Sequence, residues 1–145
     1  MSAGAPAVVA LESPSVVTEA YQEWVPVAGL PRWLILEALW QNGLGLHVRL
    51  CSAGPEAASV VIVFASPIAY RNIDESYRLR TWQKLAETTT ERSSLQVVTD
   101  SRWVQWLRDE AGGVLDDVVL HHYAILTDCD CVDVVTSVPP EVSYG

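Results

Sequence analysis

The run of residues 59–65 constrains the fold of this chain more than any other feature, because it reads Ser-Val-Val-Ile-Val-Phe-Ala without a charged side chain. β-Branched and aromatic residues favour extended backbone, since their side chains pack well on a pleated surface. Gly54-Pro55 precedes the run and Pro67 follows it, so the apolar stretch is too short for an ordinary helix. We therefore predict a central strand over residues 59–65, buried on both faces.

Two later runs rich in β-forming residues, 118–127 and 132–138, flank a short polar turn. This arrangement predicts a hairpin that ends at Pro139-Pro140. Asn42-Gly43 predicts a second hairpin, because this pair favours a tight turn and leucine and valine alternate over residues 44–50. Strand pairing is therefore predicted to be mainly antiparallel.

One helix is indicated between these β-rich regions. Residues 99–101, Thr-Asp-Ser, offer capping side chains, and apolar residues then recur at helical spacing over 103–111 until Gly112-Gly113. Residues 76–87 have a spacing compatible with a partly exposed helix or a polar edge strand. The predicted fold class is α+β, a mainly antiparallel sheet with one or two helices packed on one face.

The length of 145 residues corresponds to one domain. We expect this domain to span residues 20–145, after a loosely ordered N-terminal segment, residues 1–19, that includes a short strand near residues 7–11. Residues 21–27 show a weak alternating pattern that is compatible with another strand. We find no internal repeat in the sequence and expect no second domain.

The net charge of −9 disfavours nucleic acid and anionic membrane surfaces as partners. The charge is uneven, because residues 109–145 contain eight acids and neither Lys nor Arg. The longest uncharged apolar candidate, residues 57–69, is too short for a membrane span of about 20 residues. Residues 1–10 lack the basic start of a secretory signal, so the expected location is the cytoplasm.

Cysteine and histidine residues raise two chemical hypotheses, and neither is favoured. Cys129 and Cys131 with His121 and His122 supply zinc-ligand types, but adjacent histidines in a strand point to opposite faces, and the cysteine spacing is too short. His47 and Cys51 would lie about 13 Å apart in a strand, beyond hydrogen-bond reach. We therefore predict no metal, no cofactor and no catalytic residue.

Two polar clusters are the candidate partner-binding residues. They are Tyr70, Arg71, Asp74 and Glu75 after the central strand, and Asp128, Asp130 and Asp133 in and after the late turn. Arg71 is predicted to pair with Asp74 or Glu75, and an aromatic, charged edge is also where partners dock. The three late aspartates lack the pattern of a calcium loop, so a turn with solvated acids is predicted.

Four segments resemble small uncharacterised bacterial proteins, some of which are similar to toxin-immunity proteins. These segments are VIVFASPIAYRNIDE (61–75), DSRWVQWL (100–107), HYAILTD (122–128) and VDVV (132–135). The resemblance implies a structural core and a binding role, and it carries over no catalytic residue.

The leading functional hypothesis is a non-catalytic binding protein, an immunity-type inhibitor whose acidic C-terminal segment meets a basic protein partner. Self-association into a homo-oligomer stays open. The alternative is a small-ligand-binding protein or enzyme, with a pocket between sheet and helix lined by Trp103 and Trp106, since ligand pockets are mainly apolar and aromatic. A pocket with converging polar groups would favour this alternative.

Overall fold

The structure, a computed structural model, describes residues 18–54, 58–88 and 92–145. Over these residues the chain forms one compact α+β unit of two antiparallel sheets and two α-helices. The strand predicted near residues 7–11 lies outside the described residues. No helix in the described ranges is long and apolar enough to cross a membrane.

The first sheet has five strands in the order β1-β6-β7-β8-β5. Their bounds are Ala20–Glu23 (β1), Pro67–Asp74 (β5), Leu95–Thr99 (β6), His121–Leu126 (β7) and Asp130–Thr136 (β8). Every neighbouring pair in this sheet is antiparallel, and β7 and β8 form the predicted late hairpin. We call this five-stranded sheet sheet A.

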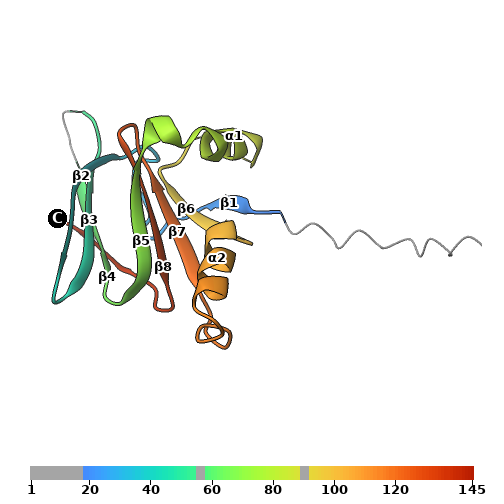
Figure 1. Cartoon of the computed structure of the whole chain (residues 1–145). Helices are drawn as coiled ribbons and strands as arrows, with labels where there is room; N and C mark the ends of the chain where they lie inside the picture. The colour runs from blue at the N-terminus through green and yellow to red at the C-terminus, as the bar shows by residue number, and fades with distance from the viewer. Residues whose placement is uncertain (1–17, 55–57, 89–91) are drawn as a thin grey trace, which may run out of the picture.

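The second sheet, sheet B, has four antiparallel strands in the order β2-β3-β4-β9. Their bounds are Ile35–Asn42 (β2), Gly45–Cys51 (β3), Ser59–Phe64 (β4) and Glu141–Tyr144 (β9). The predicted turn at Asn42-Gly43 joins β2 to β3. Sheet B faces one side of sheet A, and the helices lie on the other side, so the molecule has three layers (Figure 1).

The helical layer contains α1 (Leu79–Thr88), α2 (Arg102–Glu110) and the short 3₁₀ helix η1 (Glu75–Tyr77). Ser101 caps α2 as predicted, because its side chain accepts a hydrogen bond from the Val104 amide at 3.1 Å. For residues 76–87 the sequence was compatible with a helix or an edge strand. In the structure η1 and α1 make this region helical over most of its length.

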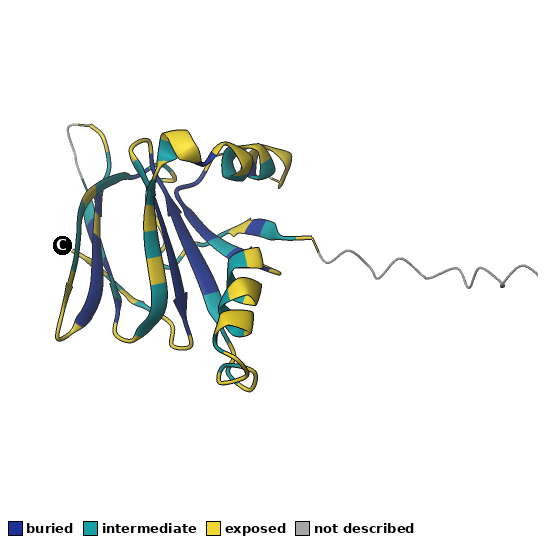
Figure 2. Cartoon of the chain, viewed as in Figure 1, coloured by how far each residue is buried: buried dark blue, intermediate teal, exposed yellow. Residues whose placement is uncertain are grey.

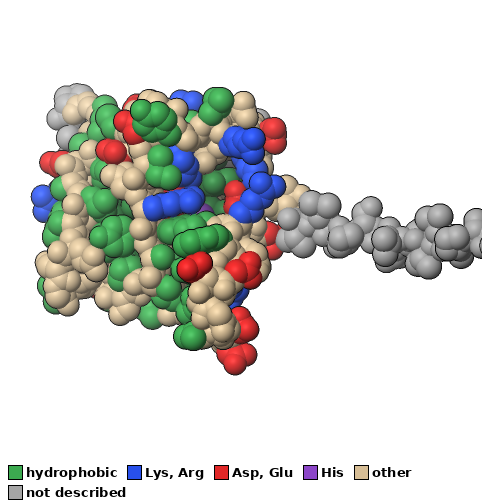
Figure 3. All heavy atoms as spheres, in the orientation of Figure 1, with side chains coloured by type: hydrophobic (Ala, Val, Ile, Leu, Met, Phe, Trp, Pro, Cys, Tyr) green, Lys and Arg blue, Asp and Glu red, His purple; other side chains and the backbone are tan. Residues whose placement is uncertain are grey.

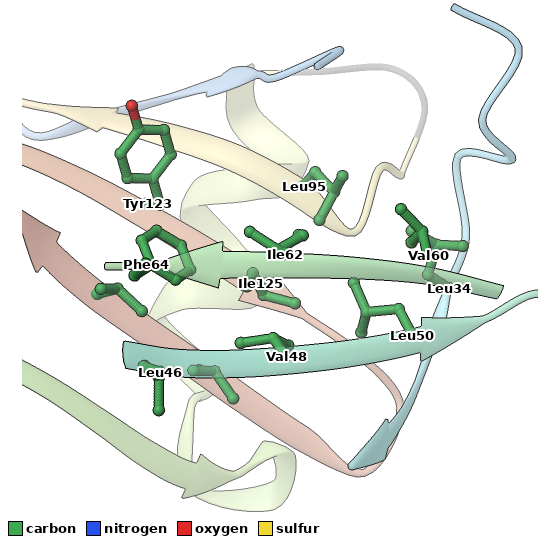
Figure 4. Close-up of a cluster of buried hydrophobic side chains, with 12 residues drawn as sticks. Leu34, Leu46, Val48, Leu50, Val60, Ile62, Phe64, Leu95, Tyr123 and Ile125 are labelled. Atoms are coloured by element: carbon green, nitrogen blue, oxygen red, sulfur yellow. The ribbon is translucent and has the colours of Figure 1, made fainter. Parts of the chain in front are cut away.

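The main apolar core lies between the two sheets (Figure 4). Along β3 and β4 the inward side chains alternate with outward ones, and Leu46, Val48, Val60, Ile62 and Phe64 are all buried. Twelve buried residues form this cluster. A second, smaller cluster lies between sheet A and α1 and includes Leu85 of α1.

Two details of the strand prediction are wrong. β4 is central, since it pairs with β3 and β9, but it belongs to a different sheet from β7 and β8. It is also fully buried on one face only, because buried and half-buried residues alternate along it. Sheet B covers one face of sheet A, and the helices cover the other face. The burial map accordingly shows the most continuous burial along β7 and β8, the strands covered on both sides (Figure 2).

Candidate functional site

A buried polar cluster lies on the helix-facing side of sheet A, where apolar packing would be expected. Its centre is Asp133 of β8, which has no exposed surface. Arg71 of β5 is the direct cross-strand partner of Asp133 on one side, and Ala124 of β7 is the partner on the other. Since Ala124 projects only a methyl group, the space above it is open to larger polar side chains from β7 and the helical layer.

Three nitrogen donors reach the Asp133 carboxylate. Arg71 Nε and Arg78 Nη1 both contact Oδ2, the former at 3.1 Å, while His122 Nε2 lies 2.7 Å from Oδ1. Arg78 joins η1 to α1 and its side chain is 6% exposed, so this ion pair is buried. The carboxylate therefore ties β5, β7 and the start of α1 to β8.

The charge of Asp133 is maintained by these partners. Burial alone would raise the pKa of the carboxyl, but the hydrogen bond from His122 and the positive charge of Arg78 outweigh it. Together they hold the pKa of Asp133 well below its usual range. Asp133 is therefore an acceptor at every ordinary pH.

His122 extends the cluster to α2. Its Nδ1 atom lies 2.7 Å from Ser101 Oγ, and both residues are buried. Ser101 follows Asp100, whose φ of 52° lies in the left-handed region that few residues other than glycine adopt. This turn between β6 and α2 brings the Ser101 hydroxyl back over sheet A.

Trp103 covers the cluster from the solvent side. Its ring lies edge-on to His122, with centroids 5.3 Å apart, and the Arg71 guanidinium lies 4.4 Å from the ring centroid. Arg71 is thus fixed at Nε by Asp133 and held on one face by an aromatic ring. Its side chain is still 37% exposed, and among the described residues nothing accepts from its terminal nitrogens.

Two hollows that share lining residues open on the helical side of sheet A, one beside Arg71 and α2 and the other between α1 and the start of α2. One, of about 470 Å³, is lined by Glu19, Arg71, Arg102, Trp103 and Trp106. The other, of about 420 Å³, shares Glu19 and Arg102 and continues along α1. We call these two hollows together the interhelix groove. Trp103 and Trp106, the two tryptophans predicted to line a pocket, therefore both line it.

The interhelix groove is basic although the chain is acidic (Figure 3). Its basic lining residues are Arg71, Arg80, Lys84 and Arg102. The lining carboxylates are only two, Glu19 and Glu87. A concave, low-dielectric surface concentrates the field of such charges, so the groove attracts anions.

One anionic group already occupies part of the groove. Glu19, which directly precedes β1, accepts hydrogen bonds from Lys84 Nζ at 3.1 Å and from the Arg102 amide at 2.7 Å. Its side chain is only 13% exposed. The groove can therefore accommodate a carboxylate with direct hydrogen bonds, at the positive end of α2.

A third hollow, of about 610 Å³, lies on the opposite side of the α2 N-terminus. Ser101 and His122 line it, together with Arg102 and residues of β6 and the start of β7. Arg102 thus borders all three hollows. Ser101 and His122 lie in the wall of this hollow at the N-terminus of α2.

The predicted partner-binding residues lie in three places. Asp74 and Asp130 are opposite each other in β5 and β8, and the Glu75 amide donates to the carbonyl of Cys129. Asp74, Glu75, Asp128 and Asp130 therefore share one edge of the molecule, which we call the acidic corner. Here the fold joins residues from both predicted clusters.

Asp133 and Arg71 are exceptions to the sequence interpretation. Asp133 was expected in a solvated turn, but it is buried in β8, because its position in the strand faces the helices. Arg71 was expected to pair with Asp74 or Glu75, but it pairs with Asp133 across the sheet. Tyr70 points to the other face, and its hydroxyl donates to Gln41 of β2 at 3.0 Å.

Nothing in the sequence pattern singled out Arg78, His122 and Ser101 as one group. One signal was available, since Asp133 stands inside the run Val-Asp-Val-Val, and an acid within a buried strand requires partners. His121 and His122 do point to opposite faces. Among the described residues, no three His, Cys, Asp or Glu side chains are grouped as metal ligands would be.

The chain matches no protein-family model, no curated protein and no solved structure. The function is therefore inferred from the residues of this chain and their geometry.

Proposed function

We propose that the protein binds a small anionic ligand in the interhelix groove. The observation that carries this proposal is the state of Arg71. Asp133 fixes its Nε, Trp103 covers one face, and its side chain lines the groove and is 37% exposed. A guanidinium oriented in this way can donate two parallel hydrogen bonds to a carboxylate or phosphate with little further loss of freedom.

The rest of the groove supports the same ligand chemistry. Arg102 lines the same hollow as Arg71, Lys84 lines the adjoining one, and Glu19 is an example of a carboxylate bound there. Trp106 is 55% exposed on the rim, so it offers a flat apolar surface to the remainder of a ligand. Together these features suit a planar ring that carries one carboxylate or phosphate.

Phenyl phosphate, benzoate and neutral phenol are suitable probes. We expect phenyl phosphate and benzoate to quench tryptophan fluorescence on titration and phenol to do so much more weakly. Arg71→Gln should weaken binding of the two anions at least about tenfold, because a charge-assisted hydrogen bond contributes about 1.5–3 kcal/mol. The comparison of phosphate with carboxylate identifies which anion fits better.

Arg49→Gln is the matched control. Arg49 also lies over a tryptophan, with its guanidinium 5.0 Å from the centre of the Trp40 ring, but it is on sheet B, away from the groove. Arg49→Gln should leave the binding of phenyl phosphate and benzoate unchanged. Equal loss of affinity in both variants would mean a general charge effect and would contradict a specific site at Arg71.

A second candidate function is docking of a basic protein partner at the acidic corner. The acidic corner combines negative charge from the end of β5 with negative charge from the β7–β8 turn. Beside it, Tyr77 is 81% exposed and Leu79 is 66% exposed. Charged rims accelerate association, and exposed aromatic side chains supply contact area. This candidate keeps the hypothesis of an inhibitor of a basic partner, without Asp133 in the contact.

The test of this second candidate is a capture experiment with purified full-length protein at low and high salt. A basic protein should be retained at low salt and lost in the variant Asp74→Asn, Asp128→Asn, Asp130→Asn. Retention by the triple variant equal to that of the unmodified protein would rule out the acidic corner as the docking surface.

A further inference from the structure

Ser101, His122 and Asp133 form a continuous hydrogen-bonded chain. Ser101 Oγ lies 2.7 Å from His122 Nδ1, and His122 Nε2 lies 2.7 Å from Asp133 Oδ1. The three residues come from the α2 N-cap, β7 and β8. All three are buried, so bulk water does not compete for these hydrogen bonds.

The direction of each hydrogen bond follows from Asp133. An ionised carboxylate only accepts, so in the neutral imidazole the proton is on Nε2. Nδ1 is then an acceptor, and the Ser101 hydroxyl donates to it. Ser101 Oγ also accepts from the Val104 amide, which stabilises negative charge on the oxygen.

This is the arrangement in which a serine hydroxyl becomes a nucleophile. One ring nitrogen receives the hydroxyl proton, and the other donates to a buried carboxylate that fixes the ring and stabilises its charged form. Compared with the Ser-His-Asp triad of serine proteases, the two ring nitrogens are exchanged. The exchange keeps the chemistry, because imidazole accepts a proton at either nitrogen.

Ser101 and His122 line the 610 Å³ hollow, which is the side from which a substrate would approach the hydroxyl. The positive end of α2 is at Ser101, where it favours negative charge on a reacting carbonyl oxygen. Arg102 borders both this hollow and the interhelix groove, so an anionic group of a substrate at Ser101 can meet the charge of Arg102 at the boundary between them.

We propose that Ser101 is a nucleophile toward carboxylic esters whose acyl part carries an anionic group. His122 acts as the general base, and Asp133 is a positioning residue that holds the ring. The preference for an anionic acyl part rests on the groove proposed above, whereas the nucleophile itself does not.

The reaction is an ordinary ester hydrolysis in two steps. Ser101 Oγ bonds to the ester carbon while its proton passes to His122 Nδ1. The bond to the alcohol oxygen then breaks, and that oxygen takes the proton. Water next attacks the acyl-serine, gives a proton to Nδ1, and releases the acid as Ser101 Oγ recovers the proton. The sum is ester plus water giving acid plus alcohol.

A fluorophosphonate probe, followed by peptide mapping of the full-length protein, tests the nucleophile directly. We expect labelling at Ser101 and none at exposed Ser76, which lacks an imidazole neighbour. Ser101→Thr keeps a capping hydroxyl and should fold, but should react much more slowly. His122→Gln should lower the labelling rate at least about 100-fold, since a general base contributes at least this factor.

Two esters distinguish the proposed nucleophile from the proposed anion-binding groove. The protein should cleave 4-nitrophenyl hydrogen succinate, which is anionic, faster than neutral 4-nitrophenyl acetate, and Arg102→Gln should lower the rate on the anionic ester more than the rate on the neutral ester. Absence of Ser101 labelling in protein that still binds benzoate would overturn the nucleophile and leave the groove intact. Labelling with equal rates on both esters would overturn the anionic preference and count against the groove.

Discussion

Arg71 and Asp133 are direct neighbours across β5 and β8, and their side chains form an ion pair of 3.1 Å although 62 residues separate them in the chain. The same carboxylate binds Arg78 and His122, which come from the helical layer and from β7. One buried acid therefore organises the face of sheet A beneath both helices. The stability of the helical layer and the geometry of the groove should depend on it.

Replacement of Asp133 should be strongly destabilising. Asp133→Asn removes the negative charge and leaves Arg78 buried without its counter-ion, which typically costs about 3–5 kcal/mol. Urea denaturation followed by tryptophan fluorescence measures the loss. Asp130→Asn, three residues earlier in the same strand but near the surface, is the matched control and should change the free energy of unfolding by less than about 0.5 kcal/mol.

The stability of the protein should fall in acid because of the same residue. The pKa of Asp133 in the folded protein is depressed, so the unfolded chain takes up a proton at a higher pH than the folded chain does. The contribution of Asp133 is thus complete above its unfolded pKa of about 4 and is lost as the pH decreases from there toward the folded pKa.

Urea midpoints measured from pH 7 to pH 2 test this dependence. The difference between the unmodified protein and Asp133→Asn isolates the residue from the other carboxylates. We expect that difference to be constant above about pH 5 and to shrink below about pH 4. A constant difference down to pH 2 would show that Asp133 has an ordinary pKa in the folded state.

Ser101 should contribute to stability as well as to the proposed chemistry. Ser101→Ala removes the cap of α2 and the partner of His122 Nδ1, so we expect a loss of about 1–2 kcal/mol. Ser101→Thr should recover most of this loss, because threonine also caps helices. Thermal unfolding of the three proteins under one condition tests the order: unmodified, then Ser101→Thr, then Ser101→Ala.

The two cysteines of the late hairpin should react very differently. Cys129 is exposed, whereas Cys131 is buried and burial raises the pKa of its thiol to about 11. Since the thiolate is the reactive form, iodoacetamide at pH 8 should modify Cys129 rapidly and Cys131 only after unfolding. After labelling under native conditions or in urea, fragmentation mass spectrometry of the tryptic peptide 109–145, which contains both cysteines, distinguishes the two sites. Equal rates in the native protein would mean that β8 opens readily.

Local sequence patterns determined most of the individual elements. Ser59–Phe64 and Asp130–Thr136 are extended because β-branched side chains restrict the backbone, and Asn42-Gly43 forms a turn because both residues tolerate its geometry. Ser101 starts a helix because its hydroxyl satisfies a free amide of the first turn. Each of these effects acts within a few residues, so the sequence alone suffices to predict the α+β class.

Only the tertiary structure decided which strands share a sheet and what Asp133 contacts. Strand pairing joins residues that are far apart in sequence, so β4 and β8 are both rich in valine and still belong to different sheets. The same pairing sets Asp133 opposite Arg71 and buries it, although its neighbours Asp128 and Asp130 remain at the acidic corner. A charge in a strand is solvated or buried according to the face it occupies and to what covers that face, and both depend on contacts between distant segments.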